Sequence, residues 1–137
     1  MFDLILVEDD LDDIYFFKMA CNAVTPKPNL KTLNDGTELI HYLEQNSGIG
    51  KVILLDLNMP QMGGLEVLEK LNKLQKVNQL IIITYTTSDH VEDIKSAYKL
   101  GVKSYLTKPD NLEQLTQLVS SLNKYWFTFN LGVKETV

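Results

Sequence analysis

A carboxylate stands at the end of an apolar run in the middle of the chain. Residues 52–55 are Val-Ile-Leu-Leu and lead directly into Asp56, and the Met-Pro and Gly-Gly pairs that follow are typical of a turn. A charge at the edge of a protein core is costly unless another group pairs with it. The sequence should therefore supply partners for Asp56 elsewhere in the chain.

Short apolar runs alternate along the chain with longer segments of helical periodicity, and this alternation identifies the elements that position Asp56. We expect strands at residues 3–7, 30–34, 51–56, 79–86 and 103–107. We expect helices at residues 11–24, 36–46, 64–74, 88–101 and 111–126, with Ser88 capping the fourth. Strict alternation of this kind predicts an α/β fold, in which right-handed crossovers cover both faces of one parallel sheet.

Polar residues follow the expected strands at the points where ligands bind in open parallel sheets, outside the carboxyl ends. The strands end at Glu8 and Asp9, at Asp56, at Thr86 and at Lys108. Crowded carboxylates repel one another unless a cation lies among them, and hard oxygen ligands suit Mg²⁺. A carboxylate that binds Mg²⁺ and faces a lysine is a nucleophile toward phosphorus, because the metal and the lysine share the charge of the phosphoryl group.

These residues, taken in their order and spacing, resemble the receiver domain of bacterial two-component response regulators. The matching features are the acidic pair Glu8-Asp9, the segment 54–64 around Asp56, Thr86, Tyr105 and Lys108-Pro109. The resemblance covers residues 2 to about 124. It implies a flavodoxin-like three-layer (βα)5 sandwich, whose parallel five-stranded sheet has the order 2-1-3-4-5.

The resemblance also implies a phosphoryl acceptor and its metal ligands. Asp56 would accept the phosphoryl group, and Asp9 and Asp56 would bind Mg²⁺ directly. The backbone carbonyl of Asn58 would be a third ligand, and Glu8 would reach the metal through water. Asp9 and Asp10 are the alternative acidic pair, but the apolar strand ends immediately before Glu8, and an acid at position 10 suits a helix start.

A switch is implied by the same resemblance. Lys108 would contact the phosphoryl group and Thr86 would move toward it. Tyr105 would then rotate inward and change the face made by the fourth helix, fifth strand and fifth helix. Residues 86–109 and the aromatic residues 125–127 are similar to those of single-domain receivers paired with bacterial phytochromes and other sensor kinases.

Two other functions fit the sequence less well. An aspartate-dependent phosphohydrolase needs a second Asp two residues after its nucleophile, and Asn58 stands there. A flavin carrier would need a phosphate-binding loop after the first strand, where the five acids between positions 8 and 13 would repel a phosphate. The alternative that stays open is an interaction module that works without phosphorylation.

Length, composition and charge limit the domain number, the partners and the location expected of the protein. The 137 residues fit one domain, and no apolar run approaches the roughly 18 residues of a membrane span. A net charge of −5 argues against nucleic-acid binding. The start of the chain lacks a secretory signal, and the lone Cys21, expected in the core, agrees with a reducing compartment. The expected location is the cytoplasm.

For several other residues the sequence predicts a structural place and no role in the site. Asp12 and Asp13 should form a solvated first helical turn, and His41 and His90 should lie on polar helix faces. Three aromatic residues, Trp126, Phe127 and Phe129, lie past the expected end of the last helix. They either fold back on the domain or extend an apolar contact surface, which would support a homodimer.

The sequence as a whole predicts a receiver domain at residues 1–127 and a C-terminal tail at 128–137, with no output domain. A sensor histidine kinase or a phosphotransfer protein would phosphorylate Asp56. The chain would act by contact with an unidentified downstream protein or as a carrier in a phosphorelay. It would be a signalling protein that catalyses only its own phosphorylation and dephosphorylation, not an enzyme, with no nucleic-acid or membrane partner.

Overall fold

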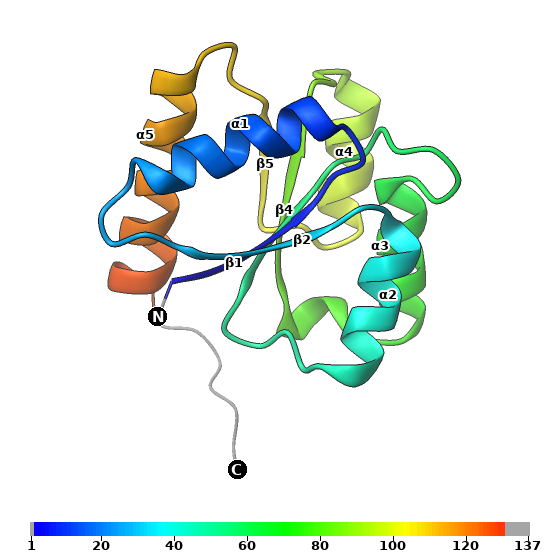
Figure 1. Ribbon diagram of the computed structural model, residues 1–137. Coiled ribbons are helices and arrows are strands. Elements are labelled where there is room, and N and C mark those ends of the chain that lie inside the picture. Colours follow the sequence, from blue (N-terminus) through cyan, green and yellow to red (C-terminus); the bar gives the residue numbers. More distant parts are fainter. Residues whose placement is uncertain (1, 131–137) are drawn as a thin grey trace.

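The protein alternates five strands with five α-helices along residues 2–130, the part of the chain that the computed structural model describes (Figure 1). The strands are β1 (Asp3–Val7), β2 (Asn29–Leu33), β3 (Val52–Leu55), β4 (Ile81–Thr86) and β5 (Ser104–Thr107). The α-helices are α1 (Leu11–Asn22), α2 (Gly36–Gln45), α3 (Gly64–Lys73), α4 (Val91–Lys99) and α5 (Leu112–Leu122). A 3₁₀ turn, η1 (Val77–Gln79), precedes β4, and a π-type segment, η2 (Asn123–Phe129), follows α5.

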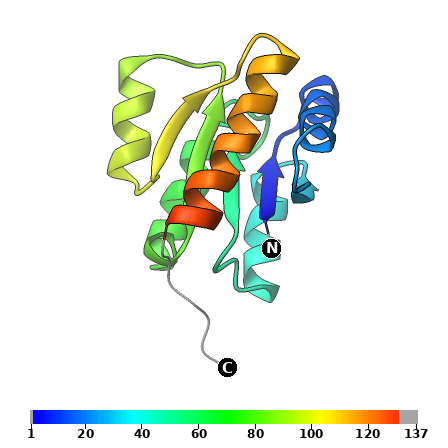
Figure 2. The same cartoon turned by 90° about the vertical axis from the view of Figure 1, so that its left-hand side faces the viewer.

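The strands form one parallel sheet in the order β2-β1-β3-β4-β5, which confirms the predicted fold class. Side chains of α1 and α5 pack on one face of the sheet, and those of α2, α3 and α4 pack on the other. Figures 1 and 2 show these three layers. All four residues of β3 are buried, as expected for a central strand covered on both faces.

The start of α4 differs from the prediction. The helix begins at Val91 with His90 at its N-cap position, so the expected cap at Ser88 is wrong. The Ser88 hydroxyl instead donates a hydrogen bond to Asp93 Oδ2 at 2.7 Å. A serine that bonds a carboxylate in the first turn satisfies the polar groups there without capping the helix itself.

The end of the last helix also differs from the prediction. Of its aromatic residues, some fold back on the domain and another is exposed to solvent. Regular α-helix ends at Leu122 and continues as η2. The chain folds back so that the ring centroids of Phe127 and Phe2 are 4.8 Å apart. Trp126 packs against the core that contains Phe2. Phe129 is 74% exposed. Residues 131–137 of the predicted tail lie outside the described residues.

None of the helices formed by residues 2–130 has the length and apolar character needed to cross a lipid bilayer. Cys21 is buried as expected, and burial raises the pKa of its thiol to about 12.

Candidate functional site

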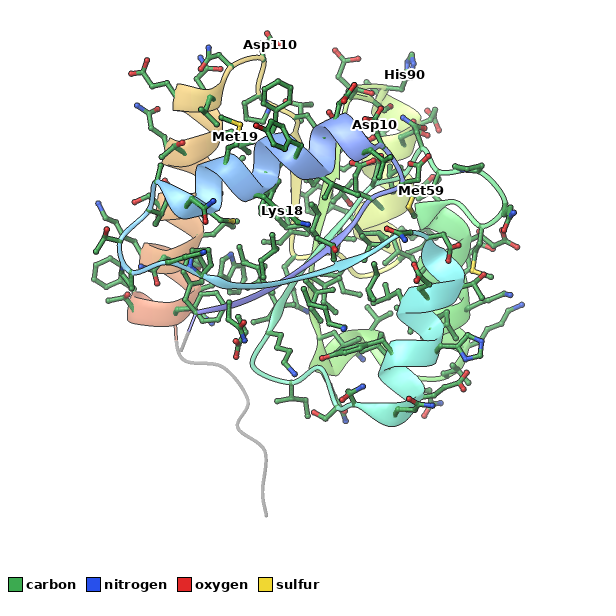
Figure 3. The ribbon with its side chains drawn as sticks, viewed as in Figure 1. Asp10, Lys18, Met19, Met59, His90 and Asp110 are labelled. Atoms are coloured by element: carbon green, nitrogen blue, oxygen red, sulfur yellow. The ribbon has the colours of Figure 1, made fainter. Side chains whose placement is uncertain are left out.

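The candidate site lies where β1, β3, β4 and β5 end, because parallel strands bring their carboxyl ends to one edge of the sheet. Figure 3 shows Asp10, Met59, His90 and Asp110 toward the same end of the molecule. These four residues belong to the connections that follow β1, β3, β4 and β5 respectively. The predicted functional side chains come from the same connections and strand ends.

Three carboxylates gather at this edge. One oxygen each from Glu8, Asp9 and Asp56 lies within 4.8 Å of the others. Glu8 and Asp56 are buried and Asp9 is exposed. An all-carboxylate set of this size, open to solvent on one side, fits a hard divalent cation that keeps part of its water shell. These residues could hold a metal ion such as Mg²⁺.

Asp10 has a different role from its neighbours. Its Oδ1 accepts hydrogen bonds from the backbone N–H groups of Asp12 and Asp13 at 2.9 and 3.1 Å, so it caps α1. The geometry favours Glu8 and Asp9 over Asp9 and Asp10 as the acidic pair of the site.

The backbone around Asp56 is fixed by hydrogen bonds between neighbouring strands and loops. The Asp56 N–H donates to the Val7 carbonyl at 3.2 Å. The Asn58 N–H donates to Asp56 Oδ1 at 3.1 Å, while its side-chain amide donates to Thr86 Oγ1 at 3.3 Å. Asn58 therefore links the acidic strand end of β3 to the hydroxyl at the end of β4. The metal-binding role of its carbonyl stays a prediction.

Lys108 is the positive centre of the site. Its ammonium lies 2.5 Å from Glu8 Oε1, 2.7 Å from Asp13 Oδ2 and 3.2 Å from Asp56 Oδ2. Its backbone N–H donates to the Thr86 carbonyl at 2.8 Å, which ties the start of the β5–α5 connection to β4. The structure thus brings Lys108 and Asp56 into contact from positions 52 residues apart.

Burial and charge shift the pKa values of two partners in this contact, Glu8 and Lys108. Burial raises the pKa of the Glu8 carboxyl to about 8, a hydrogen bond from Lys108 opposes this effect, and the Asp56 charge adds to it. For Lys108, burial alone would lower the pKa, but hydrogen bonds to Asp13 and Glu8 and the charge of Asp56 raise it above its usual range. Excess negative charge at this edge therefore favours a bound cation.

The prediction of a solvated first helical turn holds for Asp12, which is exposed, and holds only in part for Asp13, which is partly buried. The Asp13 side chain is 37% exposed and pairs with Lys108. Helical spacing places Asp13 on the same face of α1 as the buried Phe17, but the ion pair depends on where the β5–α5 connection places Lys108, 95 residues further along the chain.

Thr86 and Tyr105 lie on neighbouring strands beside the acidic cluster. Thr86 is fully buried, and its Oγ1 accepts hydrogen bonds from Asn58 Nδ2 and, at 3.5 Å, from the Ser88 N–H. The Tyr105 hydroxyl donates to the Ser88 carbonyl at 2.9 Å. Partial burial raises the pKa of this hydroxyl, so it stays protonated as a donor.

A parallel sheet in the order 2-1-3-4-5, with clustered carboxylates and a lysine at its carboxyl edge, places the protein in the CheY-like class of flavodoxin-type folds. The family model for the response regulator receiver domain matches residues 4–120, and the chain belongs to this family. Receiver domains are signalling modules of two-component systems and not typical enzymes.

Individual relatives agree with this assignment. The chain is 32% identical to the response regulator Rcp1 of Synechocystis sp. over 128 residues, which cover 90% of this chain and 87% of Rcp1. The structure of the phosphorylated cyanobacterial phytochrome response regulator RcpA superposes with a TM-score of 0.80 at 32% identity, covering 94% of this chain and 96% of RcpA. The Mn²⁺-bound structure of Rcp1 also gives a TM-score of 0.80, at 28% identity, covering 98% of this chain and 100% of Rcp1.

Proposed function

We propose that Asp56 accepts a phosphoryl group from a sensor histidine kinase or a phosphotransfer protein, and that this reaction uses Mg²⁺ held by Glu8, Asp9 and Asp56. The observation that carries the proposal is the distance of 3.2 Å between Lys108 Nζ and Asp56 Oδ2, within a cluster of three carboxylates. A buried carboxylate with a lysine on one side and metal ligands on the other is arranged for attack on phosphorus.

In the transfer step, an oxygen of Asp56 forms a bond to phosphorus while the bond between phosphorus and the donor's imidazole nitrogen breaks. The bonding electron pair stays on the nitrogen of the departing imidazole. Lys108 would pair with a phosphoryl oxygen as charge develops there. Mg²⁺, when bound, supplies further neutralising charge to the phosphoryl oxygens. Two relatives support these points, because RcpA is known in a phosphorylated form and Rcp1 in a Mn²⁺-bound form.

The response would pass from Asp56 through Thr86 to Tyr105. Thr86 Oγ1 accepts only weak, long hydrogen bonds, at 3.3 and 3.5 Å, so little opposes its movement toward a phosphoryl oxygen. The hydroxyl of Tyr105, a partly buried side chain, donates one hydrogen bond to the Ser88 carbonyl, in the connection between β4 and α4. A change in that connection would release the tyrosine and alter the face made by α4, β5 and α5.

Partners and location follow from the same proposal. A downstream protein would recognise the altered face, and the sequence gives no reason to expect a nucleic-acid or membrane partner. The expected location is the cytoplasm. A homodimer stays a prediction, supported by the exposed rings of Tyr98, Tyr125 and Phe129 on or next to α4 and α5. An interaction module that works without phosphorylation is the second candidate.

The first prediction concerns the acceptor itself. Incubation with acetyl phosphate and Mg²⁺ should add one phosphoryl group to the wild-type protein, and Asp56→Asn should abolish the addition because the nucleophilic oxygen is lost. Intact-mass spectrometry measures the adduct, and removal of Mg²⁺ with a chelator should suppress it. Asp12→Asn removes the same charge from an exposed position and should react like wild type.

Failure of the wild-type protein to form an adduct would count against phosphorylation only if the phosphoryl group is not hydrolysed before it can be detected. A beryllofluoride titration of the wild-type protein decides this point, because the complex mimics a phosphoryl group without being hydrolysed. Binding would retain Asp56 as the acceptor, whereas no binding would favour the phosphorylation-independent module.

A further inference from the structure

The Lys108 ammonium has three N–H donors and three carboxylate neighbours. Two of these neighbours, Glu8 and Asp56, belong to the acidic cluster from which the function was proposed. The third, Asp13, lies in the first turn of α1 and belongs to no part of that cluster. Its Oδ2 accepts from Lys108 Nζ at 2.7 Å, which is shorter than the distance from Lys108 to Asp56.

Asp13 is held in place by its own helix. Its backbone N–H donates to the capping carboxylate of Asp10 at 3.1 Å, so the main chain from which its side chain projects is anchored. A lysine side chain, in contrast, is a flexible stem that adopts many rotamers. The anchored Asp13 carboxylate can therefore restrict the position of the Lys108 ammonium more than Lys108 restricts the position of Asp13.

Space beside Lys108 makes such a restriction useful. Asp13 and Lys108 both line a cavity of about 270 Å³, together with Phe16, Tyr85 and Thr87. The cavity would admit other positions of the ammonium, away from Asp56. The Tyr85 ring, whose centroid is 5.8 Å from Lys108 Nζ, offers a further attraction in that direction. Holding Lys108 close to Asp56 thus requires contacts on more than one side.

We propose that Asp13 is a positioning residue, which fixes the Lys108 ammonium toward Asp56 for phosphoryl transfer. This inference rests on the proposed function of Asp56. The ordinary alternative is a partly exposed ion pair that contributes little to stability and nothing to the reaction. The two differ in what the loss of Asp13 does to the rate at Asp56.

Asp13→Asn removes both a negative charge and a contact to Lys108, and these two losses predict opposite changes in the rate of Asp56 phosphorylation. Removing a negative charge near the site should by itself favour an anionic phosphodonor. Loss of an oriented lysine should slow transfer, because small misplacements of a catalytic group carry large kinetic costs. The sign of the effect therefore decides between the two influences.

The test compares Asp13→Asn with Asp12→Asn, since both variants lose one negative charge from the same helical turn. Of these two aspartates, Asp13 is the one that contacts Lys108 in the described part of the chain. We expect Asp13→Asn to lower the rate of Asp56 phosphorylation, measured at saturating acetyl phosphate and Mg²⁺, about tenfold. The dissociation constant for Mg²⁺, measured by calorimetry, should change less than about twofold. Asp12→Asn should match wild type in both measurements, and Asp13→Glu, which keeps a carboxylate, should recover part of the rate.

A double-mutant cycle identifies Lys108 as the group through which Asp13 acts. In a Lys108→Gln background, Asp13→Asn should have no further effect on the residual rate. An unchanged or increased rate in Asp13→Asn alone would overturn the inference while leaving the proposed function intact. An equal loss in Asp12→Asn, or a further loss in the Lys108→Gln background, would also overturn it. Wild-type protein that neither reacts nor binds beryllofluoride would overturn the proposed function itself, and the inference with it.

Discussion

At the scale of single residues, the site is governed by how many charges share a small volume. Glu8 and Asp56 are almost completely buried, and a single ammonium lies between them. Burial of unequal numbers of opposite charges is unfavourable unless a further cation compensates. Burial is the main cause of the raised pKa of Glu8, and the charge of Asp56 adds to it.

Two buried threonines on β4 show how differently one residue type can behave. Thr86 Oγ1 accepts hydrogen bonds, whereas Thr84 Oγ1 is buried without a hydrogen-bond partner among the described residues. Because valine has nearly the same shape as threonine and lacks the hydroxyl, Thr84→Val should raise the free energy of unfolding by about 1 kcal/mol. Urea denaturation measures the change.

Thr86→Val serves as the matched control for this substitution. The same chemical change at Thr86 removes an acceptor that Asn58 and Ser88 use, so stability should fall or stay unchanged. Destabilisation by Thr84→Val would show that its hydroxyl has a partner in solution.

At the scale of elements, the helix starts determine where the functional loops lie. Each strand that contributes to the site is followed by a short connection and then by a helix, so the position of the helix fixes the connection. The β5–α5 connection carries Lys108 and ends at Asn111, whose Oδ1 accepts from the Gln114 N–H at 2.8 Å. This cap sets the first residue of α5 and thereby the course of the chain from Lys108 onward.

Replacement of the α5 cap tests this role of the connection. Asn111→Ala should lower the free energy of unfolding by about 1 kcal/mol, because it leaves the Gln114 N–H without its acceptor. Asn111→Asp keeps an acceptor at the same position and should retain most of the stability. Chemical denaturation of the three proteins measures both effects, and equal losses in the two variants would contradict the capping role.

At the scale of the whole molecule, the sheet separates two hydrophobic cores. The core under α2, α3 and α4 is built largely from strand and helix residues predicted by periodicity. The core under α1 and α5 also includes rings from beyond the regular end of α5, because Phe127 and Trp126 pack against it. Trp126 and Phe127 of η2 therefore close this core next to β1.

Substitution of the two phenylalanines of η2 tests whether η2 packs against this core. Phe127→Ala should lower the free energy of unfolding by about 2 kcal/mol, since a partly buried ring in contact with Phe2 is lost. Phe129→Ala removes a ring that is 74% exposed and should change stability by less than about 0.5 kcal/mol. Thermal or urea unfolding measures both, and equal effects would show that η2 packs differently in solution.

The alternation of apolar runs and helical segments was enough to predict the parallel sheet, the order of strands and helices along the chain, and the strand ends that form the candidate site. Periodicity is a local property, so the strands and helices could be recognised within a few residues of their ends. Because parallel strands share one carboxyl edge, the residues after each strand could be assigned to a common site: Glu8, Asp9, Asp56, Thr86 and Lys108. Helix ends were less accurate, as the start of α4 at Val91 shows.

Which of two neighbouring side chains of the same type makes a long-range contact depends on tertiary packing. Asp12 and Asp13 stand in the same acidic turn, yet Asp13 alone meets Lys108, from 95 residues away. Phe127 and Phe129 stand two residues apart, yet one packs on Phe2 and the other faces solvent. Contacts between distant segments depend on how whole elements pack together, and a local sequence pattern indicates a buried face without identifying the residue that it meets.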